Sequence, residues 1–204
     1  MTDNVEVKRS YTVPILFLIM MVMLTLIIIF YSKYLLTDQA RKTDQGQALT
    51  QRYNFALLFA ERLHDGADGL LNAKTEAERI RSVRMLGEAE VAAGEAAALF
   101  GEATSRSSGQ SSEEAGKPFF STISSLMGSE GRLATIGERE GSLNAEETEV
   151  LIQARDAAAE MQEALGEFRP LTGEAGYRSM ATKNEWVASA VKAGEALQRS
   201  FSAK

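Results

Sequence analysis

The stretch VPILFLIMMVMLTLIIIFY, from Val13 to Tyr31, decides how this 204-residue chain is organised. It contains neither a charged residue nor a glycine, and as a helix rising ~1.5 Å per residue it extends about 28 Å, close to the ~30 Å hydrocarbon core of a bilayer. A helix that is apolar on every side does not have the one-sided pattern of a helix at the surface of a globular core. We therefore predict a transmembrane anchor at residues 13–36, preceded by a short cytoplasmic tail at residues 1–12.

A cleaved signal peptide is the alternative interpretation of this stretch. Signal peptides have apolar cores of ~7–15 residues, followed by a cleavage site with small residues such as Ala-x-Ala. The apolar run here is longer, and YSKYLLTDQA at residues 31–40 offers no good Ala-x-Ala site. Tyr31 and Tyr34 also occupy positions where aromatic residues of membrane helices meet the lipid–water interface. The sequence therefore favours an uncleaved, single-pass anchor.

The basic residues around the apolar stretch say little about its orientation. Lys8 and Arg9 precede it, while Lys33, Arg41 and Lys42 follow it, so neither side has the excess of Lys and Arg that marks the cytoplasmic side. Because the N-terminal tail is short, we expect it to stay in the cytoplasm and the C-terminal domain to be extracytoplasmic. The expected location is the cell membrane.

The chain beyond the apolar stretch is acidic and lacks cysteine. The formal net charge is −6, and because acidic and basic residues balance within residues 1–12, this excess lies beyond the stretch. An acidic surface repels nucleic acid, so we do not expect nucleic-acid binding. Without cysteine, neither a disulfide nor a thiolate metal site can form.

A polar segment at residues 37–52 follows the apolar stretch. It contains good helix formers, so we predict a helical stalk there. From Tyr53 onward, apolar residues recur at every third or fourth position, which predicts a helix with one buried face. The run His64-Asp65-Gly66 is expected to end this helix, because a glycine stands just past the last apolar position.

The predicted helical bundle comprises residues 53–204. Its second helix is expected at residues 69–103, with Ile80 in its buried stripe. The sequence TSRSSGQSSEEAGKP then predicts a flexible loop near residues 104–118, because it is rich in serine and glycine and has no apolar anchor. A shorter helix is expected between residues 119 and 136, interrupted by glycines.

Asn144 gives the strongest signal for the start of a helix. Together with Glu147 it forms a relative of the capping box, and apolar residues keep helical spacing until Pro170. A loop is expected after Pro170, and a last helix near Thr182. No alternating β-branched run of strand length occurs, so we predict an all-α fold: an N-terminal transmembrane helix followed by an extracytoplasmic antiparallel bundle of four to five helices.

The triplet Gly-Glu-Ala occurs three times at a spacing of seven in the second predicted helix, beginning at Gly87, Gly94 and Gly101. Each glycine inside a helix costs ~1 kcal/mol relative to alanine, and a closely approaching neighbouring helix could recover this cost. An Ala- and Gly-rich composition alone explains the spacing equally well. These glycines, with Tyr53 and Trp186, form the candidate partner-binding surface; the alternative for the two aromatic residues is that they anchor the core.

The sequence contains no convincing catalytic, cofactor-binding or metal-binding constellation. His64 is the only histidine, and Glu61-x-x-His64 is a single copy of a motif that di-metal bundles use twice. We expect His64 to interact with the end of its helix. The acidic runs at residues 138–140 and 146–149 are expected to be solvated helix faces. The chain is therefore not expected to be an enzyme or to bind a cofactor or metal.

The layout of the chain is similar to that of one known family. The anchor is followed by LTQRYNFALLFAERLH at residues 49–64, LATIG at 133–137, LNAEE at 143–147 and EMQEAL at 160–165. Over roughly residues 15–190 this resembles the N-terminal helical region of the YpeB family of spore-germination proteins, in pattern and without a diagnostic motif. The PepSY modules of that family are not expected here, because the chain ends before any could begin. The resemblance implies an envelope protein that works through protein partners, such as a cortex-lytic enzyme.

Two functional hypotheses follow. The first is a non-catalytic, membrane-anchored, extracytoplasmic interaction or scaffold module of a bacterial envelope. It would bind the lipid bilayer through residues 13–36 and associate with a protein partner or a second copy. The alternative is a ligand-sensing four-helix-bundle domain that binds a small molecule between its helices and acts with a separate output subunit.

Overall fold

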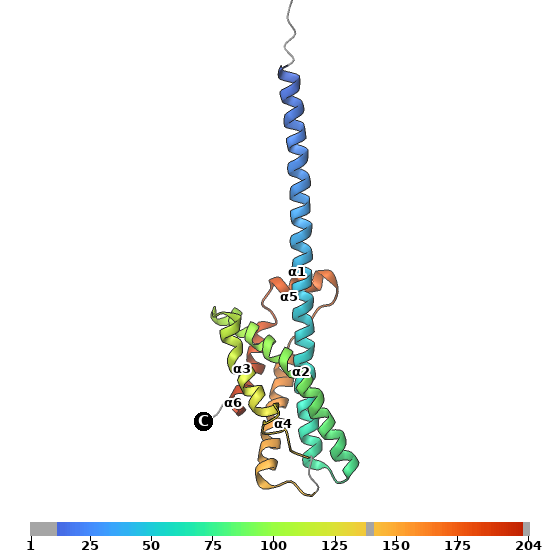
Figure 1. Cartoon of the computed structure of the whole chain (residues 1–204), viewed down its shortest axis with the longest axis vertical. Helices are drawn as coiled ribbons and strands as arrows, with labels where there is room; N and C mark the ends of the chain where they lie inside the picture. Colours follow the sequence, from blue (N-terminus) through green and yellow to red (C-terminus); the bar gives the residue numbers. More distant parts are fainter. Residues whose placement is uncertain (1–11, 138–140, 202–204) are drawn as a thin grey trace, which may run out of the picture. The chain divides into compact units, whose positions relative to one another are not determined.

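The computed structural model describes residues 12–137 and 141–201, and within these ranges all regular secondary structure is helical (Figure 1). The prediction of an all-α fold is confirmed. The expected tail, apart from Thr12, and the acidic run at residues 138–140 lie outside the described residues. The helices are α1 (Thr12–Asn72), α2 (Glu76–Ser108), α3 (Ser112–Met127), α4 (Ala145–Gly166), α5 (Gly173–Thr182) and α6 (Val187–Phe201).

The chain divides into two compact units, residues 1–41 and residues 42–204, and the second is called the body below. In the first unit, α1 is helical from Thr12, and every large apolar side chain from Val13 to Leu36 is at least 40% exposed. The hydroxyl of Thr25 donates a hydrogen bond to the carbonyl of Met21 at 2.9 Å, so this polar group is satisfied within the helix. This part of α1 is long and apolar enough to span a membrane.

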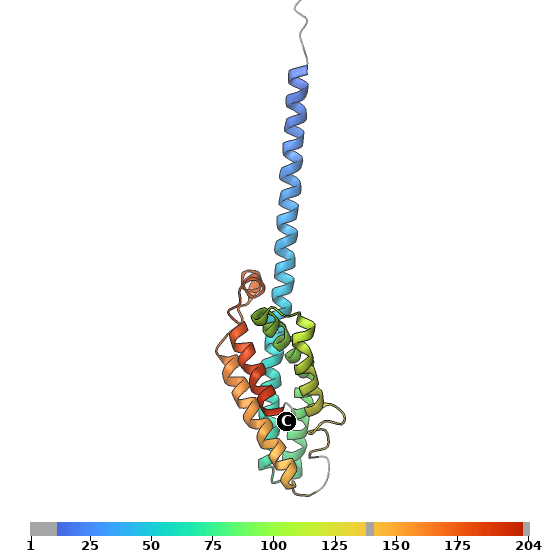
Figure 2. The ribbon, with the colours of Figure 1, turned by 90° about the vertical axis from the view of Figure 1, so that its left-hand side faces the viewer.

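The body is built from the C-terminal half of α1 together with the five later helices (Figure 2). After a short turn at residues 73–75, α2 packs along α1. Both α3 and α6 pack on α2, and α4 packs on α6. One cluster of buried apolar side chains joins these helices. Its largest fully buried members are Trp186, Tyr53, Phe59, Phe100, Leu63, Leu99, Leu126, Leu151, Met161, Leu165 and Leu197.

α1 continues through Gly66, where the sequence predicted its end. A Cβ atom added to Gly66 would lie 2.7 Å from Cδ2 of Leu86, and one added to Gly69 would overlap the hydroxyl of Ser82. The two glycines therefore let α2 approach α1 closely, which alanine would prevent. The expectation of a helix end at Gly66 is wrong, because the two glycines lie inside α1, where their lack of a side chain allows the close contact with α2.

A capping box sets the start of α2 at Glu76 rather than at residue 69. The backbone N–H of Glu78 donates to the Thr75 hydroxyl at 3.3 Å, and the backbone N–H of Thr75 donates to the Glu78 carboxylate at 3.1 Å. Hydrogen bonds from the backbone N–H groups of Lys74 and Thr75 lower the pKa of the Glu78 carboxyl from its ordinary value. The Thr-x-x-Glu signal was present in the sequence and was missed.

The serine-rich stretch at residues 104–118 is almost entirely helical, so the expected flexible loop is wrong. α2 extends to Ser108, where Gly109 ends it with a left-handed φ of 77°. Ser111 then caps α3 by accepting a hydrogen bond from the backbone N–H of Glu114 at 3.3 Å. Serine and glycine act here as caps of two adjoining helices.

The start of α4 agrees with the prediction. The side chain of Asn144 accepts a hydrogen bond from the backbone N–H of Glu147 at 2.8 Å, and the Glu147 carboxylate accepts one from the backbone N–H of Asn144 at 2.8 Å. The expected break at the glycines of the preceding helix is confirmed, because α3 ends at Met127 with Gly128 as its C-cap. The helix begins at Ser112, earlier than the expected start at residue 119, and does not reach Ile136.

The region after Pro170 is not the expected loop, because it contains α5. This helix crosses α1 at Gly46, where an added Cβ atom would overlap the carbonyl of Tyr177. Leu49 is also buried, so the body begins to pack before Tyr53 and takes in part of the predicted stalk. α6 starts at Val187 rather than near residue 182, because residues 183–186 form a connection that brings Trp186 into the core.

Candidate functional site

Tyr53 lies in the core and is 0% exposed. The alternative that it anchors the core is confirmed, and its assignment to a partner-binding surface is wrong. Its hydroxyl donates a hydrogen bond to the carbonyl of Leu165 at 2.7 Å, and its ring meets that of Phe168 edge-on, with centroids 5.4 Å apart. The last carbonyls of a helix have no partner within the helix. Tyr53 supplies one to α4 and so links α1 to α4.

Tyr53 predicts a specific loss of stability at alkaline pH. Burial raises the pKa of its hydroxyl far above the ordinary value of about 10. Above about pH 10, the ordinary tyrosine pKa, the unfolded chain releases this proton while the folded chain retains it. The free energy of unfolding should therefore fall by up to about 1.4 kcal/mol per pH unit. Below about pH 10 the hydroxyl is protonated in both states, so it does not make the free energy of unfolding depend on pH.

The test is denaturant unfolding of the parent chain and Tyr53→Phe, in detergent, from about pH 8 to about pH 11, a window around the ordinary tyrosine pKa. Phenylalanine should reduce the alkaline slope. It should also cost about 0.5–1.5 kcal/mol at neutral pH, because the Leu165 carbonyl loses the Tyr53 donor and keeps the backbone N–H of Phe168 at 3.3 Å. An unchanged slope in the variant would show that Tyr53 is not the responsible group.

Trp186 is likewise 0% exposed. The alternative that it anchors the core is confirmed, and its assignment to a partner-binding surface is wrong. Its indole N–H donates to the carbonyl of Met180 at 3.1 Å, and the guanidinium carbon of Arg106 lies 5.2 Å from the centre of the ring. Arg106 also donates to the carbonyl of Ala181 at 3.3 Å. Trp186 and Arg106 therefore satisfy carbonyls in the last turn of α5 and join that helix to the core.

The three glycines of the heptad have different environments. A Cβ atom added to Gly101 would lie 2.6 Å from Cα of Gly116 in α3, so two backbones meet at this point. Gly87 and Gly94 have nothing within 4 Å of an added Cβ atom. The interpretation of a closely approaching helix within the chain is therefore correct for Gly101 alone.

This difference predicts opposite effects of the same substitution. Gly101→Ala should destabilise the body by about 1–3 kcal/mol, because α2 and α3 must move apart. Gly87→Ala and Gly94→Ala should stabilise it by up to about 1 kcal/mol each, because alanine favours the helix and meets no neighbour. Thermal unfolding followed by circular dichroism measures all three, and a stabilising Gly101→Ala would contradict the observed helix contact.

His64 lies within α1 rather than at its end, and its Nδ1 is 3.1 Å from a carboxylate oxygen of the adjacent Asp65. Both side chains are partly exposed. Among residues 12–137 and 141–201, no group of three or more His, Asp or Glu side chains is placed to bind a metal ion. The geometry around His64 therefore supplies neither a nucleophile–base pair nor a ligand set.

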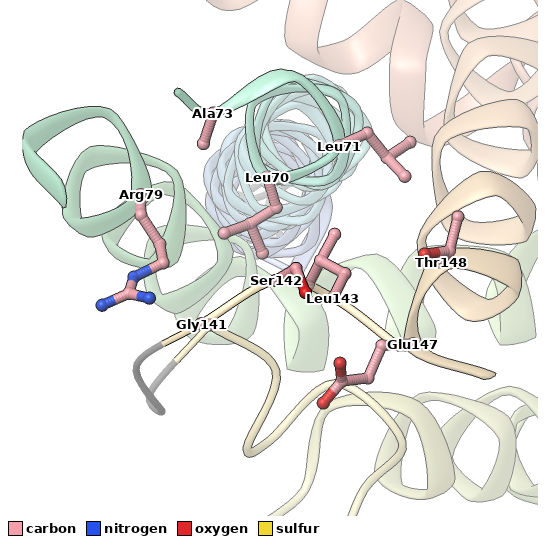
Figure 3. A pocket seen from close by; sticks show the side chains of 10 residues that line it. Leu70, Leu71, Ala73, Arg79, Gly141, Ser142, Leu143, Glu147 and Thr148 are labelled. Atoms are coloured by element: carbon pink, nitrogen blue, oxygen red, sulfur yellow. The ribbon is translucent and has the colours of Figure 1, made fainter. Parts of the chain in front are cut away.

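A pocket of about 300 Å³ lies where α1 ends and α4 begins (Figure 3). Leu70 and Leu71 of α1 and Leu143 from the connection before α4 give it apolar walls, while Arg79 and Glu147 supply charge. This volume is at the lower end of the range for ligand pockets, about 300–1,000 Å³. The pocket is one place in the body where the ligand-sensing alternative could apply.

The charged groups of this pocket are engaged at the starts of helices. Arg79 donates to the Glu76 carboxylate at 2.6 Å in the first turn of α2, and Glu147 belongs to the capping box of α4. Their established contacts serve helix ends, and the arrangement indicates no particular ligand class. The ligand-sensing hypothesis stays a prediction, for which a thermal-shift screen with small metabolites is the test.

The most exposed apolar side chains of the body lie on α2. Val91 is 81% exposed and Ile80 is 60% exposed, so the assignment of Ile80 to the buried stripe is wrong. Sequence reasoning did not single out this face. Its signal was the spacing of Ile80, Gly87, Val91 and Gly94, which places them together on one side of a helix.

Comparison of the chain with protein-family models, with curated proteins and with solved structures finds no match. The resemblance to the YpeB family stays a prediction. The functional proposals therefore rest on the sequence and on the geometry described above.

Proposed function

We propose that this protein is a non-catalytic interaction module, anchored in a bacterial cell membrane through residues 13–36, with its body on the extracytoplasmic side. The observation that carries the proposal is the exposure of every large apolar side chain between Val13 and Leu36. Covering one such side chain is worth about 1.5–3 kcal/mol, and nothing in the described chain covers them. A lipid bilayer is the environment that would do so.

The surface of the body supports its placement in water. Ion pairs connect its helices on the outside, among them Arg62 with Glu88 at 3.1 Å and Lys192 with Glu167 at 2.9 Å. Such exposed pairs add little stability, because water and salt screen them, but they characterise a solvated surface.

The absence of cysteine makes the proposed orientation directly testable. In Ser107→Cys the new thiol lies on an exposed part of α2, and a membrane-impermeant maleimide should label it in intact cells. Asn4→Cys, on the other side of the apolar stretch, should be labelled only after permeabilisation. The reverse pattern would place the body in the cytoplasm and overturn the proposed orientation.

The interaction role requires a binding surface, and the exposed apolar face of α2 is the best candidate. A photo-crosslinking amino acid at Val91 should give one discrete adduct in intact membranes, either with another protein or with a second copy. The same group at Glu163, an exposed position on α4, is the matched control and should give none. The interaction role would be contradicted if none of the three positions Val91, Ile80 and Phe120 of α3 gave an adduct.

A further inference from the structure

Residues 169–185, which contain α5 and are called the α5 segment below, lie against the part of α1 where the body begins. The guanidinium of Arg178 donates a hydrogen bond to the hydroxyl of Thr43 at 3.4 Å. A Cβ atom added to Gly46 would overlap the carbonyl of Tyr177, so the backbones of α1 and α5 touch about one turn further along. The α5 segment is therefore held to the first residues of the body.

The length of the chain limits how far the α5 segment can lie from the apolar stretch. Thr43 follows Leu36, the end of that stretch, by seven residues, which span ~10 Å as the helix α1 and at most ~25 Å when fully extended. This limit holds for every orientation of the body relative to the anchor. Lipid headgroups occupy the first ~5–7 Å beyond the hydrocarbon core, and in physiological salt electrostatic forces extend ~8 Å further. Where residues 13–36 span a bilayer, Arg178 is therefore within reach of its charged surface.

The distribution of charge in the chain favours this end of the body for contact with an anionic surface. Residues 41–46 and the α5 segment together have five basic and three acidic side chains, a net charge of +2. Residues 102–117, which the hydrogen bond from Arg106 to Ala181 holds beside α5, carry −1. Because residues 1–40 balance and the whole chain carries −6, all other residues together carry −7. An anionic surface repels those acidic parts and attracts the α5 segment.

The α5 segment also exposes an apolar side chain among basic ones. Leu171, in the connection before α5, is 58% exposed. Arg169 is also exposed, and the side chain of Lys183 is 62% exposed. Lys183 and Arg178 each lie within 3.5 Å of an acidic side chain of the same segment, but such exposed pairs are weak. An exposed leucine among basic side chains is the combination found in segments that lie at the lipid–water interface.

We infer that the α5 segment contacts the headgroups of anionic lipids in the membrane that holds the anchor. Arg169 and Lys183 approach lipid phosphates, while Leu171 lies at the level of the headgroups. This inference rests on the proposed membrane anchor and adds a second contact between the chain and the bilayer. The contact would hold the body in one orientation relative to the membrane, and so determine which of its faces a protein partner can reach.

The test uses full-length Leu171→Cys, whose thiol is unique because the chain contains no cysteine. An environment-sensitive fluorophore on this thiol is measured in vesicles that contain phosphatidylglycerol and in vesicles of phosphatidylcholine alone. In the anionic vesicles its emission should shift to the blue, and a spin label on the lipid headgroups should quench it. Ile152→Cys, an exposed apolar position on α4, is the matched control and should show neither effect. Equal signals from the two positions would overturn the inference.

Charge reversal tests whether anionic lipid is the partner. Adding Arg169→Glu/Lys183→Glu to Leu171→Cys should lower the ratio of docked to undocked body about 25-fold or more, because each basic residue near an anionic surface is worth about fivefold. Lys74→Glu/Arg84→Glu changes the charge equally at exposed positions elsewhere in the body and should leave the signal unchanged. A signal that is the same in neutral vesicles and resists the first reversal would contradict the contact with anionic lipid.

Flotation of the vesicles after alkaline carbonate treatment separates this inference from the proposed anchor. A labelled chain that floats with the vesicles but shows no quenching by the headgroup label retains the anchor, and the lipid contact of the α5 segment is then refuted. A chain that carbonate releases from the vesicles contradicts the anchor itself, and the inference that rests on it fails as well.

Discussion

The double variant Met21→Arg/Leu24→Arg is expected to be released from membranes by alkaline carbonate, under conditions that leave the parent chain in the membrane pellet. Both positions lie near the middle of the apolar stretch, and their side chains are exposed on the helix. An arginine at the centre of a membrane helix costs ~2.5–3.5 kcal/mol on insertion, so two cost about 5–7 kcal/mol. The body has its own core and should remain helical in the released variant.

Two measurements make this experiment decisive. Gln45→Arg/Gln47→Arg adds the same charge at exposed polar positions further along α1, and this control should stay in the pellet. Mass spectrometry of the membrane-bound parent should give a chain that still contains residues 13–36. A parent chain that carbonate releases, or a mature chain that begins after residue 36, would refute the anchor and favour a signal peptide.

Trp186→Ala should produce the largest loss of stability of any single substitution in the body, about 3–5 kcal/mol. The substitution leaves a cavity in place of a fully buried side chain and removes the N–H donor of the Met180 carbonyl. It also removes the ring that faces Arg106, a contact worth ~0.5–1 kcal/mol or more. For a chain of this size, thermal unfolding should shift down by roughly 10 °C or more.

Circular dichroism of the full chain in a mild detergent measures this shift. Trp186→Phe retains most of the apolar volume but not the N–H group, so it should cost about 1–3 kcal/mol. Phe120→Ala removes a large aromatic side chain that is 49% exposed, and its cost should be much smaller. Similar costs for Trp186→Ala and Phe120→Ala would mean that Trp186 does not anchor the core.

Local signals in the sequence were sufficient for several features of the fold. The apolar helix at residues 13–36 follows from composition alone, because its length and its lack of charge do not depend on any neighbour. The cap at Asn144 follows from two residues that lie three positions apart, so their hydrogen bonds form wherever the helix is placed. The helical class of the body was likewise predicted from the apolar periodicity.

The errors concern glycines and surfaces, for which the sequence is ambiguous. Gly109 ends α2, whereas Gly66 and Gly69 lie inside α1 and allow α2 to approach it closely. A glycine permits both outcomes, because it lacks the Cβ atom that restricts φ and also the one that keeps helices apart. Nothing in the local sequence states which neighbour will approach.

The chain thus determines its apolar segment and its helices by interactions within a few residues of each other. Only the packing of distant segments decided that Tyr53 and Trp186 are core residues and that Ile80 and Val91 face outward. The physical reason is that burial depends on contacts between residues far apart in the sequence, and periodicity cannot specify which face of a helix such as α2 will have a neighbour.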